Sequence, residues 1–174
     1  MLKKFSLVLG LCLLSVACSG PPPGDPTPES IQSAPQRIGP ITVTAPDGVE
    51  IAATIPSVGR PTMILVHGWM CDQTYWENQL PALVGHYGLV TVDLAVHGLS
   101  GSEREVWTIA SLGEDVAAVI RRFHLDDVVV VGHSMGGRVG LEAARLMPDS
   151  VLGVIGVDTL QTTETDWSPE RFEA

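Results

Sequence analysis

Residues 128–147, VVVVGHSMGGRVGLEAARLM, join an apolar run to a helical pattern through a turn that contains three glycines. Four consecutive valines predict a strand that is buried on both faces, because β-branched residues favour strands and no polar residue alternates with them. After the turn, apolar residues recur at helical spacing as far as Pro148. A strand that passes directly into a helix is half of a strand-helix-strand unit, so this stretch constrains the chain to a parallel sheet covered by helices.

The same alternation of short apolar runs and helical segments extends over the chain from Ile38 onward. Residues 41–55, ITVTAPDGVEIAATI, predict a β-hairpin with its turn at Asp47-Gly48. Further buried strands are expected at TMILVHG, GLVTVDL and VLGVIGVD, and helices at DQTYWENQLPALVGHYG, TIASLGEDVAAVIRRFH and MGGRVGLEAARLMP. The expected fold class is α/β, with a mostly parallel sheet and helices on both of its faces.

Length and charge narrow the class of protein further. The chain has 174 residues, of which 45% are hydrophobic and 17% charged, enough for one domain with one core. Twenty acidic residues against ten basic ones give a formal net charge of −10, and no stretch gathers Arg or Lys into a patch. Nucleic-acid binding is therefore not expected, because it needs basic groups to neutralise the phosphates.

The amino terminus has the composition of an export signal. MLKK supplies positive charge, and the apolar run FSLVLGLCLLSVA that follows is thirteen residues long, too short for an ordinary transmembrane helix. The stretch LLSVAC resembles the lipobox of bacterial lipoproteins, although Ser15 stands where leucine is preferred. The resemblance implies a signal peptide at residues 1–17, lipidation of Cys18 and a place in the cell envelope. Ordinary secretory cleavage after Ala17 is the alternative.

The next segment is expected to tether a folded body to that anchor. Residues 18–37 hold six prolines and almost no large apolar side chains, a composition typical of an extended linker. Cys12 lies in the signal and Cys18 at the anchor, so Cys71 is the one cysteine left in the body. An internal disulfide is therefore excluded there.

The turn in the opening stretch matches a motif with a known chemical use. Gly132-His133-Ser134-Met135-Gly136 is a G-x-S-x-G pattern, and it stands between an expected strand and an expected helix. A nucleophile at the end of a buried strand needs such a tight turn, and the glycines relieve the crowding around it. A phosphate-binding turn is the alternative, but no lysine follows as a P-loop requires.

With this elbow, the chain from about Ile38 to its end resembles the α/β-hydrolase superfamily, in particular the branch with GHSMGG elbows. Two further segments carry the resemblance: LVHGW at residues 65–69 and DLAVHGLS at residues 93–100. Val96 stands where a glycine is usual in the second of these, so the loop backbone is expected to differ there. The resemblance implies that residues 38–174 are the N-terminal part of a hydrolase domain and that residues 158–174 begin its cap region.

The resemblance also implies roles for single residues. Ser134 would be the nucleophile, and the backbone N–H groups of Trp69 and Met135 would form the oxyanion hole. Asp158, which ends an expected strand, is the candidate acid, with a helix cap or a plain loop residue as the alternative. Asp93 is expected to brace the loop that follows it.

The base of the expected triad has no candidate at the usual place. In the family the histidine follows the acid, whereas every histidine of this chain precedes Ser134. The resemblance gives His67 a structural role in the oxyanion turn, the elbow geometry makes His133 a poor base, and His97 is the only distant substitute. His86 and His124 are expected at helix ends. The histidine base is therefore expected to be absent from this chain, which would make the chain a fragment or a shortened form.

The function implied is that of a serine hydrolase acting on a small-molecule ester, amide or related acyl bond, held at the membrane by its lipid. A hydrolase-fold binding module without turnover, and a carbon-carbon bond hydrolase that uses the same serine, remain alternatives. An aspartate nucleophile, as in dehalogenases and epoxide hydrolases, is disfavoured because the elbow holds serine. No cofactor or metal site is expected, since H-E-x-x-H, C-x-x-C and G-x-G-x-x-G are all absent. The sequence does not indicate an oligomeric state.

Overall fold

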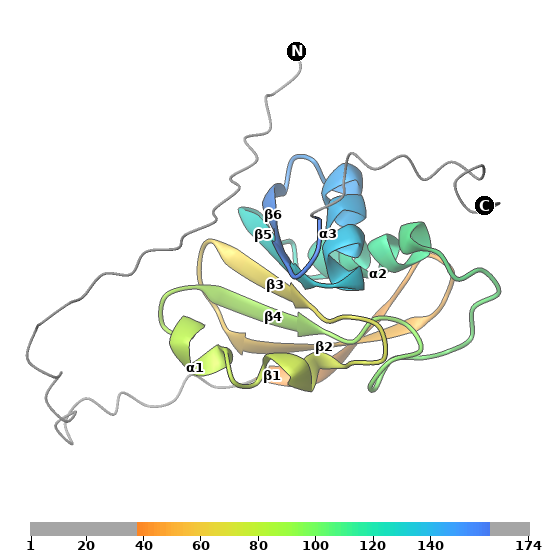
Figure 1. Ribbon diagram of the computed structural model, residues 1–174, viewed down its shortest axis with the longest axis horizontal. Coiled ribbons are helices and arrows are strands. Elements are labelled where there is room, and N and C mark those ends of the chain that lie inside the picture. Colours follow the sequence, from red (N-terminus) through yellow and green to blue (C-terminus); the bar gives the residue numbers. More distant parts are fainter. Residues whose placement is uncertain (1–37, 161–174) are drawn as a thin grey trace, which may run out of the picture. The chain divides into compact units, whose positions relative to one another are not determined.

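A computed structural model describes residues 38–160 of the chain (Figure 1). The expected signal peptide, Cys18, the tether at residues 18–37 and residues 161–174 of the expected cap segment lie outside these residues. In chain order the elements are β1 (Ile38–Thr44), β2 (Glu50–Ser57), β3 (Thr62–Val66), the 3₁₀ helix η2 (Gln73–Trp76), α1 (Leu80–Leu83), β4 (Gly88–Val92), α2 (Ile109–Arg122), β5 (Val128–His133), α3 (Met135–Leu146) and β6 (Val151–Val157).

The strands form one sheet in the order β1-β2-β4-β3-β5-β6. β4, β3, β5 and β6 run parallel to one another, and β1 and β2 are antiparallel additions at one side. The expected hairpin is confirmed: Ala45 N donates to Val49 O at 2.8 Å across a turn in which Gly48 has a φ of 90°. The mostly parallel sheet expected from the sequence is therefore confirmed.

Helices cover both faces of the sheet, but unequally. On one face α2 and α3 lie side by side (Figure 1), and Val116 and Val139 from these helices join the large apolar core with Ile64 and Val130 from the strands. On the other face Trp76 of η2 packs in a smaller cluster with Leu65 and Val131.

The prediction of one long helix within residues 72–88 is wrong, because this segment holds only η2 and α1, of four residues each. Asp72 caps η2 by accepting the N–H of Thr74, and η2 ends at Trp76. Pro81 then stands in the first turn of α1, a position that proline tolerates. In a continuous helix Pro81 would lack an N–H and would clash with the carbonyl of Glu77, so the segment divides before it.

The parallel strands decide which loops meet. The residues that follow β3, β4, β5 and β6 lie at the carboxyl edge of the sheet, and this edge collects His67, Asp93, Ser134 and Asp158. The loops that precede these strands lie at the opposite, amino edge. Among the described helices, none combines the length and the apolar character needed to cross a membrane.

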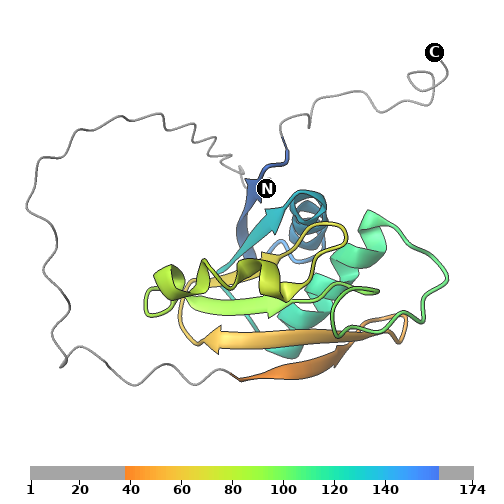
Figure 2. The same ribbon diagram turned by 60° about the horizontal axis from the view of Figure 1, so that its bottom comes forward.

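A buried arginine fixes the long loop between β4 and α2, which runs past the β1–β2 hairpin (Figure 2). Arg104 pairs with Asp115 of α2 and, at 2.6 Å, with Asp47 of the hairpin turn, and its own side chain is almost fully buried. Burial opposes the charge of Arg104, but its bonds to the two carboxylates outweigh burial and raise its pKa. Burial raises the pKa of Asp115, against the effect of the arginine. The loop is therefore tied to two different elements.

We expect the 174-residue chain to self-associate through β6. Among the described strands β6 pairs only with β5, and Ile155, on the face away from α3, is 47% exposed. An exposed apolar strand edge pairs readily with another chain. Ile155→Lys should shift the protein towards monomer in size-exclusion chromatography with light scattering, whereas Val58→Lys, an equal charge change on an exposed loop residue, should not. A wild-type chain that is already a uniform monomer would contradict this expectation.

Candidate active site

Ser134, at the junction of β5 and α3, has an unusual backbone conformation. Its backbone has φ 49° and ψ −118°, a sparsely populated combination for a residue with a side chain, and it is exposed at the carboxyl edge. The neighbouring glycines permit this turn: a Cβ atom on Gly132 would collide with the backbone of Gly136, and one on Gly136 would lie 2.5 Å from Val66 O. The G-x-S-x-G spacing thus reflects close contact between the start of α3, β5 and β3.

Two backbone N–H groups beside this turn have no acceptor among the described residues. Met135 is the first residue of α3, so its N–H has no partner within the helix. The N–H of Trp69 likewise has none. The loop that carries Trp69 passes next to the elbow, since a Cβ atom on Gly68 would lie 3.3 Å from Ser134 Cβ. Free N–H groups beside an exposed hydroxyl can stabilise an oxyanion that forms there.

His97 braces the loop that carries Trp69. Its Nδ1 donates to Ala95 O at 2.9 Å, its Nε2 accepts the N–H of Met70 at 3.2 Å, and its ring lies edge-on to that of Trp69. The ring is only 7% exposed. Because both nitrogens are engaged, His97 as it stands has no site for a proton from Ser134, and we interpret it as a structural residue rather than a substitute base.

Like His97, His67 connects the loop after β3 to the loop after β4. Its Nδ1 donates to Gly68 O at 2.7 Å, and its Nε2 accepts the N–H of Leu94 at 3.1 Å. The ring is fully buried, and burial lowers the pKa of His67, which favours the neutral form that these two bonds require. Its structural role, expected from the family resemblance, fits this geometry.

Asp93 holds the loop after β4 and the start of η2 together. Its carboxylate accepts the backbone N–H of Gln73 at 2.7 Å, the side-chain amide of Gln73 at 3.0 Å and the N–H of Leu99 at 2.9 Å. The Asp93 carboxylate thus accepts from three donors and is almost completely buried. It braces the loop, as the sequence led us to expect.

The remaining histidines form no hydrogen bond to the Ser134 hydroxyl in the described part of the chain. The ring of His133 stacks on Tyr75 with centroids 4.4 Å apart, and its Nδ1 is buried without a hydrogen-bond partner among the described residues. His86 and His124 lie in the loops that lead into β4 and β5, and therefore at the amino edge. Within residues 38–160, no histidine hydrogen-bonds to Ser134 Oγ.

Asp158 lies one strand away from Ser134. The N–H of Ser134 donates to Val157 O at 3.0 Å, so Asp158 follows directly on a residue bonded to the elbow. It is exposed, has a φ of 49°, and neither caps a helix nor forms an ion pair within the described part of the chain. The structure thus brings Asp158 and Ser134 to adjacent strand ends, and within residues 38–160 no side chain links the two by hydrogen bonds.

A pocket of about 330 Å³ opens beside the elbow. It is lined by Trp69, Ala95, His97, Trp107, Thr108, Ile109, Leu112 and Met135. Sequence reasoning missed Trp107 and the residues of α2 in this lining. A tryptophan directly before Thr108-x-x-Ser111 was the available signal, because that pattern caps a helix and leaves the tryptophan just outside its first turn.

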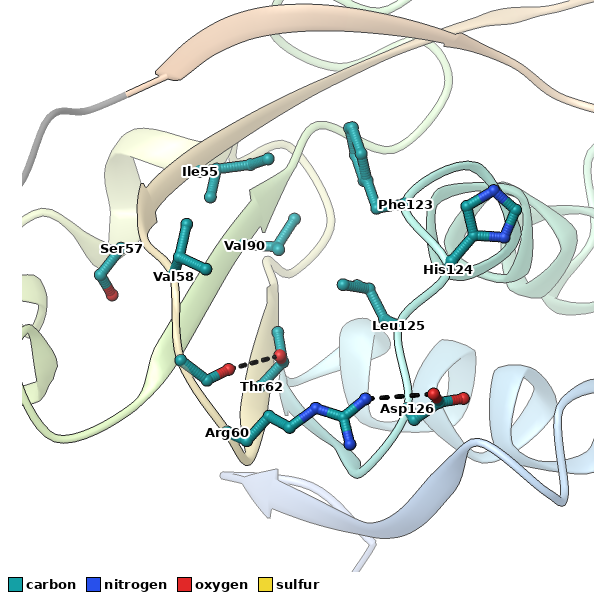
Figure 3. A pocket seen from close by; sticks show the side chains of 11 residues that line it. Ile55, Ser57, Val58, Arg60, Thr62, Val90, Phe123, His124, Leu125 and Asp126 are labelled. Atoms are coloured by element: carbon teal, nitrogen blue, oxygen red, sulfur yellow. Dashed lines mark hydrogen bonds and ion pairs between the residues drawn. The ribbon is translucent and has the colours of Figure 1, made fainter.

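A larger pocket of about 370 Å³ lies at the amino edge (Figure 3). Its floor holds apolar side chains such as Ile55, Val90 and Phe123, and its rim holds the exposed ion pair of Arg60 and Asp126 at 3.1 Å. It contains none of the residues of the elbow or of the adjoining loops. We therefore take the carboxyl-edge pocket as the candidate active site.

We expect Val96→Gly to stabilise the protein. Val96 has a φ of 67°, which is strained for a β-branched residue, and its side chain is 49% exposed, so glycine relieves strain and loses little packing. Glycine also increases the conformational entropy of the unfolded chain, which opposes part of this gain. The net free energy of unfolding should rise by about 1 kcal/mol. Denaturant titration measures the change.

Gly98→Ala is the matched control for this loop. Gly98 also has a positive φ, of 52°, but a Cβ atom there would collide with the Asp93 carboxylate. This variant should be destabilised. An unchanged or lowered stability in Val96→Gly would show that the backbone at residue 96 is not strained.

Comparison with known proteins agrees with this geometry. Residues 61–171 match the model of a family described as alpha/beta hydrolase fold. A putative esterase/lipase of Haemophilus influenzae is 33% identical over 102 residues, which are 59% of this chain and 35% of the relative. Epoxide hydrolase B of Mycobacterium tuberculosis is 33% identical over 110 residues, or 62% of this chain and 31% of the relative. The chain thus spans about a third of the length of these curated relatives.

Solved structures share the same architecture. A hydrolase from Pseudomonas aeruginosa superposes with a TM-score of 0.60 at 28% identity, over 64% of this chain and 42% of that one. A membrane phospholipase A, described as a bacterial virulence factor, does so with a TM-score of 0.61 at 29% identity, over 68% and 38%. The α/β architecture expected from the sequence is confirmed by these matches.

Proposed function

Because the chain belongs to the α/β-hydrolase fold family, we propose that it acts as a serine hydrolase on an ester, amide or related acyl bond, with Ser134 as the nucleophile. The observation that carries this proposal is the strained, exposed Ser134 beside two backbone N–H groups that have no acceptor within residues 38–160. Strain of this kind concentrates at functional sites, because the surrounding structure must hold it in place.

In the proposed reaction Ser134 Oγ attacks the carbonyl carbon of the substrate. The carbonyl oxygen becomes an anion, which the N–H groups of Met135 and Trp69 stabilise, and the dipole of α3 favours negative charge at that end. The acyl group stays on Ser134 as the leaving group departs with a proton, and water then releases the acid.

The proton of Ser134 needs a base, which we assign to none of the five histidines of the chain. His67 and His97 use both ring nitrogens for backbone groups, and none of the other three forms a hydrogen bond to Ser134 Oγ within the described residues. We propose that Asp158 is the acid that orients the base, because it ends the strand next to the elbow. The base itself would come from outside these 174 residues.

The second candidate is a binding module with the hydrolase fold and no turnover. One observation favours it: within the described residues, Ser134 Oγ has no hydrogen bond to a histidine. The two candidates differ in whether Ser134 reacts, so one set of variants separates them.

We expect Ser134→Ala to abolish both labelling by a fluorophosphonate probe and hydrolysis of p-nitrophenyl esters, tested in the complete reading frame that contains this chain. Removal of a nucleophile typically lowers kcat by about a thousandfold or more. Ser102→Ala, at an exposed position of the loop after β4, is the matched control and should keep both activities.

Three outcomes are informative beyond the expected one. Labelling that persists in Ser134→Ala would place the nucleophile elsewhere. Full esterase activity in Asp158→Asn would remove Asp158 from the triad. A folded wild-type protein with neither labelling nor turnover would favour the binding module.

We also propose that Cys18 is lipidated and holds the protein in the cell envelope. The support is the LLSVAC stretch, which ends a short apolar run and is followed by a proline-rich segment. Metabolic labelling with palmitate should mark the wild type and Cys71→Ser but not Cys18→Ser. Serine at position 19 is expected to allow sorting away from the inner membrane. Equal labelling of Cys18→Ser and wild type would contradict the proposal.

A further inference from the structure

The pocket beside the elbow is suited to an uncharged, apolar group. Trp69 and Met135 contribute to its lining, and Trp107, Ile109 and Leu112 contribute from the start of α2. Among the described residues that line it none is charged, and the nitrogens of the one histidine among them are already bonded to backbone groups. An ionic group would lose its hydration there without gaining a partner, whereas an apolar group would gain from burial.

The position of the pocket relates it to the reacting bond. Trp69 and Met135 line the pocket, and their backbone N–H groups are the two free donors beside Ser134. When the carbonyl oxygen of a substrate lies at these donors, the groups attached to the carbonyl carbon therefore lie at the mouth of the pocket. At about 30 Å³ for a water-sized group, the volume of about 330 Å³ holds roughly ten non-hydrogen atoms. That is the size of a medium-length acyl chain.

The side chain of Ser111 lies against the backbone on both sides of Trp107. The N–H of Thr108 donates to Ser111 Oγ at 3.0 Å, and the Ser111 hydroxyl has two alternative acceptors, Thr108 O at 2.9 Å and Val106 O at 3.1 Å. Trp107 precedes the N-cap Thr108, and Leu112 is four residues into α2, which are the two positions of a hydrophobic staple. These contacts restrain the backbone that carries the indole, and Trp107, which is 44% exposed, lines the pocket from there.

Arg104 positions the indole ring itself. Its guanidinium carbon lies 5.7 Å from the ring centroid of Trp107, within the range of a cation–π contact. The guanidinium is held in turn by Asp115 at 3.1 Å and by Asp47. Because both carboxylates belong to other elements, the arginine provides a fixed contact for the indole.

From these contacts we infer that the carboxyl-edge pocket binds the apolar acyl chain of the substrate, that Trp107 determines the length it accepts, and that Arg104 is the residue that positions Trp107. The inference rests on the proposed function, since it takes an acyl carbonyl as the group at the N–H donors. The substrate class is then a neutral ester or amide of a medium-length fatty acid, not of a charged acid.

The first test is a series of p-nitrophenyl esters from acetate to palmitate, with the complete reading frame. In the wild type, kcat/KM should rise roughly fourfold per added methylene until the pocket is full and then fall. Trp107→Ala should move the optimum to longer chains, while Trp107→Phe should keep it. Tyr87→Ala, which removes an exposed aromatic ring at the amino edge, is the control. A profile that is flat, or that Trp107→Ala leaves unchanged, would overturn the inference.

Arg104→Lys tests the positioning role. Lysine keeps the charge but cannot bond both carboxylates in the planar geometry of arginine. The variant should broaden the chain-length profile through KM, with kcat on the acetate ester nearly unchanged. An unaltered profile in a folded Arg104→Lys protein would remove this residue from the inference. If the variant does not fold, Asp47→Asn, which removes one of the two ion pairs that hold Arg104, should broaden the profile in the same way, and an unaltered profile in that variant would remove Arg104 from the inference.

A binding test separates the inference from the proposed function. Ser134→Ala protein is titrated calorimetrically with neutral alkyl amides from acetamide to octanamide, and with octylammonium as the charged probe. Affinity should rise by roughly fourfold per methylene, fall in Trp107→Ala and be weaker for octylammonium. Amide binding without any ester turnover would refute the hydrolase function and keep the pocket assignment. Turnover with no chain-length-dependent binding would refute the pocket assignment alone.

Discussion

The start of α3 lies so close to the end of β3 that residue 136 has no room for a side chain. A Cβ atom there would lie 2.5 Å from Val66 O and 2.6 Å from His67 O. This contact forces the chain from β5 into α3 through one strained residue, Ser134, instead of a longer loop. It also places the first N–H of α3 beside the loop that follows β3. The exposed hydroxyl and both free donors thus depend on a single backbone approach.

Loops around the elbow are held by buried polar groups rather than by apolar packing. His67 and His97 each donate to one carbonyl and accept one N–H, and Asp93 accepts three N–H groups. A buried network of this kind is costly when one partner is missing and rigid when all are present. A neutral imidazole is well suited to such a link, because one nitrogen donates and the other accepts. The two histidines therefore stiffen the site without adding charge to it.

The sequence predicted the features that depend on local patterns. Strands rich in valine, the Asp47-Gly48 turn and the elbow at Ser134 all follow from neighbouring residues. The helix expected within residues 72–88 was wrong, since Pro81 and the Asp72 cap outweigh the apolar periodicity there. That the loop backbone differs from one with glycine at position 96 stays a prediction; in this chain Val96 adopts a positive φ.

Contacts between distant residues were beyond the reach of sequence patterns. The bonds of His97 to the loop after β3, and the burial of Arg104 between Asp47 and Asp115, join segments up to 57 residues apart. No local period or motif marks them. Trp107 could be placed before a helix from its neighbours, but its position beside the elbow depends on how α2 packs against α3. For this reason the nucleophile candidate was found from the sequence and the pocket was not.

In Trp69 and Met135 the backbone and the side chain have different roles, which determines how such a site can vary. Each residue offers its backbone N–H towards the elbow and its side chain to the pocket. A substitution by any residue other than proline keeps the N–H, so in the proposed site the stabilisation of an oxyanion is insensitive to the side chain chosen. The acyl group that fits is, by contrast, sensitive to it. Under the proposed function, substrate preference can therefore change at these positions while both N–H donors are retained, and Trp107, which lines the same pocket from another loop, can change independently of both.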